Sequence, residues 1–426
     1  MSAAEVVEVS RPCPECGAEI RHDERFTPWC AACEWNVDPY SEDDEQTTRM
    51  DRYRRVLARR YGERLLREVT NGASLRPHRD ASSILAQMLA AVINASTLVM
   101  VGLAVWCLLS RLGATLIVVG ILLLAIAFVM RPRFGRLPKH TLLLRREDAP
   151  ELFAMVDEVA AAVGTRAIDR VAIDGSLNAS VSMFGLRGRR LLTIGLPLWE
   201  ILFPDERVAV LGHELGHYAN GDPRHGTILG TAIDSLLLWY YLLAPSRYNG
   251  NWLIYLANAV MFLPWVAVGG VLRLLWALTV RSAQRGEYLA DRFSARVAGP
   301  DAAARSMDKL LLDSIVATAL RRERNRGQLS GAAREEARRH PEQLWERLAA
   351  EVASVPEHER RRLRRADERQ GHAVDATHPP THLRRDCLAL APATTPAVVV
   401  DAAREERISA ELSSARRTIA LRYLGF

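Results

Sequence analysis

The sequence predicts a mainly α-helical membrane protein with four transmembrane helices in two hairpins, an α+β domain and a small cysteine-rich module. Three observations lead to this fold class: apolar runs that occur as two close pairs, two CxxC pairs near the N-terminus, and a stretch of alternating helix and strand patterns. The 426 residues are 49% hydrophobic and 25% charged, which excludes a fully disordered chain. A net charge of +6 is compatible with a nucleic acid, a membrane surface or an acidic partner.

Four of the six cysteines form two close pairs, Cys13 with Cys16 and Cys30 with Cys33. No basic segment followed by an apolar core is visible in residues 1–40, so we expect this module to stay in a reducing cytoplasm. Paired cysteines there hold metal more often than they form disulfides, and four thiolates give closed tetrahedral coordination. The pattern therefore resembles a zinc ribbon with one structural zinc ion, and a pair of redox dithiols is the alternative.

The ribbon also contains the aromatic residues Phe26, Trp29 and Trp35. They are compatible with a nucleic-acid or protein partner, but so short a segment needs them around its metal. We expect them to pack there. No partner for the ribbon can be identified from the sequence.

Residues 41–80 are predicted to form a basic linker that contains an amphipathic helix. Acidic, loop-like residues come first, and apolar residues then recur at helical spacing over residues 47–70, flanked by many arginines. Such a helix can rest on an anionic membrane surface. A solvated helical linker explains the same pattern.

The first hairpin is predicted over residues 81–131. Two apolar runs, 84–109 and 112–130, are each long enough to span a bilayer, and only Ser110 and Arg111 separate them. Basic residues cluster on the two outer flanks, whereas the tip carries one arginine. The positive-inside rule therefore places both flanks in the cytoplasm. A single kinked, buried helical element is the alternative.

Residues 228–280 contain the second apolar pair, which we interpret as another membrane hairpin. Its first run includes Asp234, which is an expensive charge inside a bilayer unless it faces a partner or a wet cavity. An apolar pair that packs against the soluble domain without spanning the membrane is the alternative.

The remaining segments, 132–227 and 281–426, are predicted to form one soluble domain in two parts, the second ending in a helical, arginine-rich region. The first part combines helix and strand patterns. We expect a helix over 149–163 and strands over 171–173, 178–184 and 191–194.

The strongest motif is HELGH at residues 213–217, in a segment that begins with Pro204 and two acidic residues, as helices often do. Residues four apart share one face of a helix. His213 and His217 can therefore hold one zinc ion while Glu214 stands beside it as a base. A hydrolytic zinc site also needs a third protein ligand and an open position for water.

We assign the third ligand to Glu287, although it lies 70 residues after His217. The predicted hairpin 228–280 accounts for 53 of these residues, and a hairpin returns the chain close to where it left. Glu287 can therefore face the histidines from a neighbouring helix. Asp291, one turn later, is placed to hydrogen-bond a ligand histidine and fix its tautomer; a surface acid beside Arg292 is the alternative.

Together these motifs resemble the HtpX-type membrane zinc endopeptidases, which are related to the CAAX prenyl proteases. The resemblance covers roughly residues 75–390. It includes the membrane layout, HELGH followed by Asn220, EYLAD at 287–291, the pair Asn178-Ala179, and HPPTHLR at 378–384. It implies a gluzincin-like α+β catalytic domain with one catalytic zinc ion. The ribbon is an addition to the family core.

The resemblance also implies roles for residues outside the HELGH helix. His378 and Arg384 are expected to stabilise the negative charge of the tetrahedral intermediate opposite the metal. A rigid Pro-Pro loop whose histidine and arginine pair with acids is the alternative. Asn178 is expected to bind substrate backbone from an edge strand, to which an extended peptide can be added.

The sequence therefore predicts a multipass cell-membrane zinc endopeptidase whose N-terminus and active site lie in the cytoplasm. Its expected partners are polypeptides, including misfolded membrane proteins in quality control, and the lipid bilayer; nucleic acid is not expected. A dedicated processing protease is a second enzyme hypothesis. The alternative of another class is a membrane-anchored adaptor with an inactive protease fold, which binds protein or nucleic acid through its ribbon and arginine-rich tail.

Overall fold

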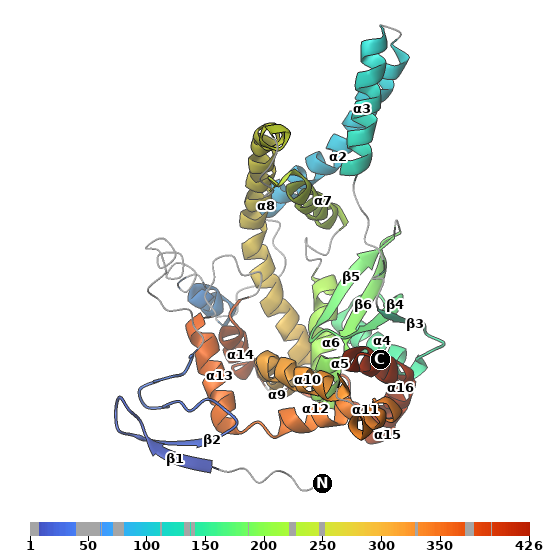
Figure 1. Cartoon of the computed structure of the whole chain (residues 1–426). Coiled ribbons are helices and arrows are strands. Elements are labelled where there is room, and N and C mark those ends of the chain that lie inside the picture. The colour runs from blue at the N-terminus through green and yellow to red at the C-terminus, as the bar shows by residue number, and fades with distance from the viewer. Residues whose placement is uncertain are drawn as a thin grey trace.

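The computed structural model describes most of the chain. The described residues are 8–39, 60, 62–70, 81–110, 113–131, 137, 141–185, 187–220, 227–246, 252–328, 331–370, 379–392 and 394–426. They are mostly helical and include a two-stranded and a four-stranded sheet. Figure 1 shows a body built around the larger sheet, apolar helices that project from it, and the N-terminal ribbon on another side.

The four-stranded sheet is mixed, with strand order β3-β4-β6-β5. Its strands are β3 (Leu142–Leu144), β4 (Arg170–Asp174), β5 (Ala179–Phe184) and β6 (Arg189–Gly195). Strands β4 and β6 are parallel and the other two pairs are antiparallel. The predicted strands are found, and β5 lies at one edge of the sheet.

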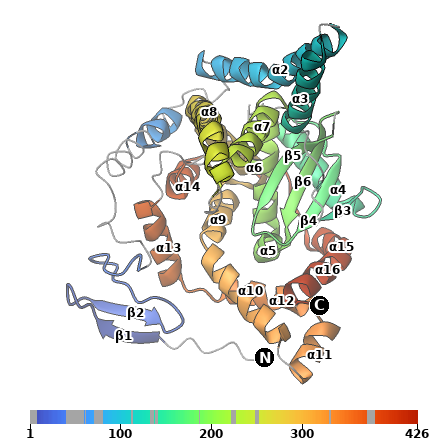
Figure 2. The same ribbon diagram turned by 45° about the horizontal axis from the view of Figure 1, so that its top comes forward.

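Helices enclose the sheet and complete the body. They are α4 (Pro150–Val163), α5 (Leu196–Ile201), α6 (Pro204–Ala219), α9 (Pro300–Leu310), α10 (Asp313–Gln328), α11 (Ala332–Arg339), α12 (Gln343–Ala353), α13 (Glu357–Gln370), α14 (Thr381–Ala389), α15 (Ala402–Glu411) and α16 (Ser413–Leu424). One apolar core joins β4 and β6 to α4, α6 and the C-terminal helices. In Figure 2 the sheet lies on one side of α6, and α13, α14 and the ribbon lie on the other.

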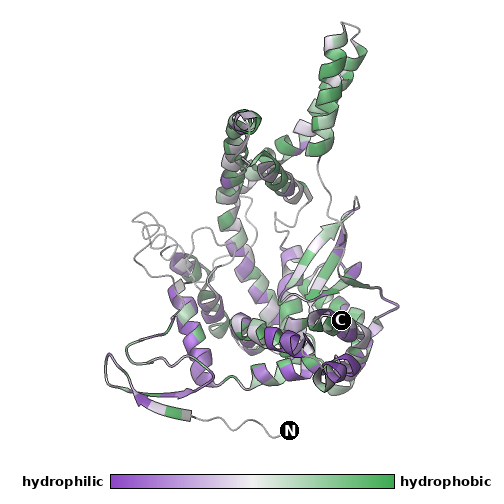
Figure 3. Cartoon of the chain, in the orientation of Figure 1, coloured by the Kyte–Doolittle hydropathy of each residue, from purple (hydrophilic) through white to green (hydrophobic). Residues whose placement is uncertain are grey.

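The projecting part consists of α2 (Ala81–Leu109), α3 (Ala114–Met130), α7 (Thr227–Leu243) and the first part of α8 (Trp252–Ala298). Helix α2 packs against α3, and α7 packs against α8, so both predicted hairpins form helix pairs. Two stretches, 81–109 and 252–280, are long and apolar enough to cross a membrane, whereas α3 and α7 are shorter apolar helices. In Figure 3 these projecting helices are mostly green, the colour of hydrophobic residues.

Helix α8 joins the projecting part to the body. It has 47 residues and is therefore about 70 Å long. It continues through residue 280, where the sequence predicts a domain boundary, and carries Glu287 and Asp291 in its second half. The second arm of the apolar hairpin and the predicted third metal ligand thus belong to one helix.

The second half of α8 packs closely against α6. This is possible because α6 presents Gly212 and Gly216, four residues apart on one face. A Cβ atom at Gly216 would lie 3.1 Å from the Cα of Ala290, and one at Gly212 would collide with Val297. The hydroxyl of Ser294 on α8 donates to the carbonyl of Ala209 over 2.7 Å.

At the N-terminus, strands β1 (Glu8–Pro12) and β2 (Glu19–Asp23) form an antiparallel hairpin in the ribbon. Further along, residues 62–70 are helical. The side chains of Leu65 and Val69 are buried against Tyr288 of α8. In this part of the predicted amphipathic helix, protein therefore covers the apolar face that we assigned to a membrane surface or to solvent.

Replacing Gly212 with Ala tests the close helix contact. Alanine stabilises an ordinary helix interior relative to glycine, but here its methyl group collides with Val297. We expect the Gly212→Ala variant to lose about 1–3 kcal/mol of unfolding free energy, measured by thermal or denaturant unfolding in detergent. Gly270→Ala is the matched control, because that α8 position is open. Equal stability of the two variants would contradict this packing.

Candidate active site

The helix that carries HELGH begins with a well-defined first turn. Pro204 occupies the first helical position, where no backbone donor is lost, and two acidic residues follow in the first turn. The carboxylate of Glu206 accepts the backbone N–H of Phe203 over 3.0 Å. Glu206 is fully buried, and the guanidinium of Arg305 lies 3.3 Å away. These contacts fix the position of α6 from which the histidines project.

Three potential metal ligands converge between α6 and α8. The Nε2 atoms of His213 and His217 are 3.2 Å apart. Glu287 places Oε2 3.4 Å from Nε2 of His213 and Oε1 3.8 Å from Nε2 of His217. Tetrahedral zinc with bonds of about 2.0–2.2 Å holds its ligand atoms about 3.3 Å apart. Two imidazoles and one carboxylate at these separations therefore fit a zinc ion that keeps a fourth position open.

Asp291 lies directly behind His213. Its Oδ1 is 2.9 Å from Nδ1 of His213, and its side chain is only 1% exposed. This contact leaves Nε2 of His213 directed at the other two ligands, as expected of a carboxylate that fixes a tautomer. Burial lowers the pKa of His213, but hydrogen bonds to Asp291 and Glu287 raise it by more, to about 10. The geometry does not match a surface acid beside Arg292.

Arg384 of α14 also reaches this site. Its Nε and Nη2 atoms lie 2.9 and 2.6 Å from the two carboxylate oxygens of Asp291, which is a bidentate pair. Its Nη1 is 3.4 Å from Oε2 of Glu287. Burial raises the pKa of Asp291, but Arg384 and His213 outweigh burial and hold this pKa below its usual value. Arg384 thus contacts Asp291 behind His213 and the potential ligand Glu287, and its role opposite the metal stays a prediction.

The other predicted site residues have different environments. Glu214 is half-buried on the HELGH helix. Asn178 is exposed immediately before β5, and its carbonyl accepts the backbone N–H of Gly195 over 2.8 Å. His378 lies outside the residues that the structure describes.

Two further residues that the sequence analysis gave no role connect the site to its surroundings. The side-chain amide of Asn220 donates to the carbonyl of Gly286 over 3.1 Å, directly before Glu287. The hydroxyl of Tyr218 donates to the carbonyl of Ser182 over 2.5 Å and ties α6 to the edge strand β5. Because Tyr218 and Asn220 follow HELGH directly, the sequence places them near the site. It does not identify their partners, which are distant in the chain.

The second group of potential metal ligands is in the ribbon. The sulfur atoms of Cys13 and Cys33, and those of Cys16 and Cys30, are 3.6 Å apart, and all four lie within 4.8 Å of one another. Zinc–sulfur bonds of about 2.3 Å require sulfur atoms about 3.8 Å apart in a tetrahedron. The four thiols thus fit a structural zinc ion.

Asp291→Asn tests the support that His213 receives. The neutral amide removes the charge that faces both His213 and Arg384, so we expect zinc affinity at the histidine site to fall about 10- to 100-fold. Competition with a chelator, measured with the ribbon metal in place, gives this affinity. The Asp301→Asn variant changes an exposed acid in the first turn of α9 and should leave the affinity unchanged. A wild-type affinity in Asp291→Asn would show that the contact is dispensable.

The comparisons with known proteins agree with this geometry. Residues 146–389, more than half of the chain, match Peptidase family M48. A search of curated proteins finds no significant match. The family match confirms the resemblance to HtpX-like metalloproteases that the motifs indicated. Members of this family use zinc. The chain therefore belongs to peptidase family M48 and is a zinc metallopeptidase, a hydrolase that acts on peptide bonds.

Proposed function

We propose that the chain is an integral-membrane endopeptidase with a catalytic zinc ion held by His213, His217 and Glu287. The observation that carries this proposal is the convergence of the three donor atoms between α6 and α8. These three residues would hold the zinc ion, which when bound would supply a Lewis acid for a peptide carbonyl and would lower the pKa of its bound water to about 7. Glu214, next to His213, takes the proton of the attacking water and returns it to the leaving amine.

Two other contacts support parts of this mechanism. Asp291 holds His213 through Nδ1 and is itself held by Arg384, so the ligand keeps its orientation. Strand β5 lies at the sheet edge and is tied to α6 through Tyr218. An extended substrate added to β5 would place its backbone beside Asn178. We retain His378 and Arg384 as proposed stabilisers of the tetrahedral intermediate.

The membrane assignment rests on the projecting helices. Large apolar side chains such as Leu98, Phe128 and Leu263 are 66–74% exposed there, which suits hydrocarbon better than water. We propose that all four apolar helices lie in the bilayer and that the basic flanks keep the N-terminus and the active site in the cytoplasm. Membrane-protein quality control is the proposed purpose, and processing of a dedicated substrate is the second candidate.

Glu214→Gln tests the proposed base. Glutamine keeps the size of the side chain but cannot take a proton, so we expect cleavage of an unfolded protein to fall about 10²- to 10⁴-fold. Zinc content should stay at the wild-type value, because Glu214 is not assigned as a ligand. Both are measured on protein purified in mild detergent.

Glu346→Gln is the control, because Glu346 is exposed on α12; it should cleave like the wild type. Full activity in Glu214→Gln would remove Glu214 as the base. Loss of zinc in that variant would show that the ligand set is wrong. A wild type that binds zinc at the histidine site but cleaves nothing in lipid would favour the inactive adaptor.

A further inference from the structure

The zinc ribbon lies against the body of its own chain. Trp29 is only 2% exposed, and its indole N–H donates to the carbonyl of His358 on α13 over 3.2 Å. The rings of Trp29 and His358 are tilted by 36°, with centroids 5.2 Å apart. Phe26 packs against the main apolar core, whereas Trp35 packs beside the cysteines. Two of the three aromatic residues that we expected around the metal thus contact the body instead.

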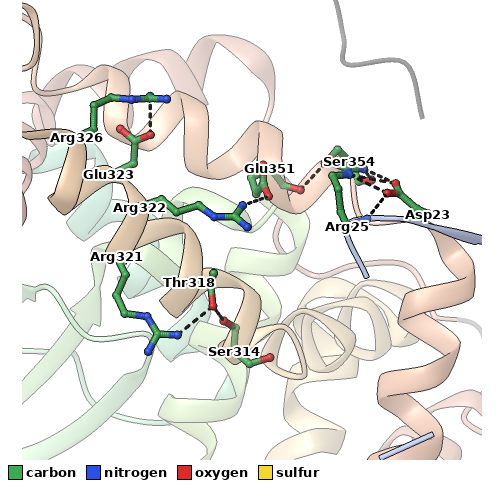
Figure 4. Close-up of polar contacts among 10 residues, drawn as sticks. All are labelled: Asp23, Arg25, Ser314, Thr318, Arg321, Arg322, Glu323, Arg326, Glu351 and Ser354. Carbon is green, nitrogen blue, oxygen red and sulfur yellow. Dashed lines mark hydrogen bonds and ion pairs between the residues drawn. The ribbon is translucent and has the colours of Figure 1, made fainter. Parts of the chain in front are cut away.

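Polar contacts made by ribbon residues before and after Trp29 in the sequence extend this interface. Arg25 is paired with Asp23 and donates to the hydroxyl of Ser354, just after α12, over 3.0 Å. Figure 4 shows this contact, with Glu351 of the same helix held by Arg322 of α10. The ribbon is therefore attached to the end of a helix that the body already holds.

The second set of contacts is on α13. The guanidinium of Arg362 donates to the backbone carbonyl of Val37 over 2.8 Å and is paired with Glu359. The Arg362 and Glu359 side chains are only 9% and 3% exposed. Undocking the ribbon would open this buried pair to water on one side and remove a hydrogen bond from Arg362, which is costly for a charged group. In the last turn of α13, Arg369 pairs with Glu34 over 2.8 Å.

Helix α13 in turn holds α14, the helix that carries Arg384. A carboxylate oxygen of Asp367 on α13 accepts the backbone N–H of His382, in the first turn of α14, over 3.1 Å. An acidic group at a helix N-terminus is favourable because it meets unpaired N–H groups and the positive end of the helix dipole. Asp308 of α9 adds a second connection, because it pairs with Arg364 of α13 and Arg385 of α14 over 3.2 and 2.9 Å.

We propose that the folded ribbon is an intramolecular brace that positions Arg384 behind the catalytic ligands. The connection runs from Trp29 and Val37 to α13, from Asp367 to α14, and from Arg384 to Asp291. Trp29, Arg362 and Asp367 are positioning residues in this proposal, because they contact neither the ligands nor the substrate. This proposal rests on the proposed function only where it predicts an effect on kcat.

The metal dependence of the brace follows from the size of the ribbon. A segment this short cannot build an adequate apolar core, so a zinc ion bound by its four cysteines supplies much of its folding energy. Only the folded ribbon presents Trp29, Glu34 and Val37 to α13 at the same time. Loss of the ribbon metal is therefore expected to release α13 without touching the catalytic ligands.

The test compares Trp29→Ala and Asp367→Ala with Arg21→Ala in the full-length protein. Trp29→Ala removes the central docking contact, whereas Asp367→Ala leaves the ribbon docked and removes the direct contact from α13 to α14, with the Asp308 connection still in place. Arg21 is an exposed ribbon residue whose ion pair, with Glu19 two residues earlier on the same strand, is itself exposed, and it serves as the control. Hydrogen exchange of residues 357–370 and 381–389 is measured together with zinc content, kcat and KM.

We expect Trp29→Ala to retain both zinc ions and to exchange faster in α13 and α14. Asp367→Ala should exchange faster in α14, with the ribbon still protected. In both, kcat should fall roughly 10-fold, as for other residues that orient ligands, with KM nearly unchanged. Arg21→Ala should match the wild type in every measurement. In an Arg384→Lys background, Trp29→Ala should cause little further loss of kcat, because both changes act on one connection.

Hydrogen exchange of α14 at the wild-type rate in both variants would overturn the brace. So would a kcat of the Trp29→Ala, Arg384→Lys double variant that falls by the product of the two single losses. If Trp29→Ala unfolds the ribbon and releases its zinc, the hydrogen exchange and kcat of Asp367→Ala test the brace without it. Failure of the proposed function gives a different result: the wild type then cleaves nothing, while the exchange measurements still report whether the ribbon holds α14. Faster exchange with unchanged kcat would show that the ribbon supports the fold but does not position Arg384.

Discussion

The site depends on one constraint, the close approach of α6 to α8. Two glycines on α6 allow the helix backbones to approach until a side chain at either position would meet Ala290 or Val297. At this distance, the histidines of one helix and the carboxylate of the other share a volume the size of one metal ion. A wider spacing would leave Glu287 out of reach of both histidines. The two glycines thus explain how a ligand 70 residues away in sequence completes the site.

Because α8 continues from the apolar hairpin to Glu287 without a break, one arm of that hairpin and one metal ligand lie on the same helix. A membrane around the hairpin would therefore fix the orientation of the site relative to its surface. The other side of the site is held by α14, whose Arg384 pairs with Asp291. The ligands lie between these two supports, one connected to the apolar helices and the other, through α13, to the ribbon.

The sequence predicted those parts of the site whose positions follow from the regular repeat of an α-helix. The spacing of His213 and His217 places them on one helix face, and the insertion of a hairpin explained the distance to Glu287. Both arguments concern helices, whose geometry is regular over long stretches. The docking of the ribbon could not be predicted, because Trp29 and His358 are 329 residues apart and no local pattern links them. The helical spacing of apolar residues over 47–70 predicted an apolar helix face, but this spacing does not determine what covers the face.

X-ray absorption at the zinc edge of the purified full-length protein tests the central claim most directly. The account predicts two zinc ions per chain in different environments: one with sulfur ligands at about 2.3 Å, and one with nitrogen and oxygen ligands at about 2.0–2.2 Å. The averaged spectrum should therefore contain both shells in nearly equal share. A spectrum with sulfur ligands alone, from protein that binds one zinc ion when zinc is supplied in excess, would contradict the assignment of His213, His217 and Glu287 as a metal site.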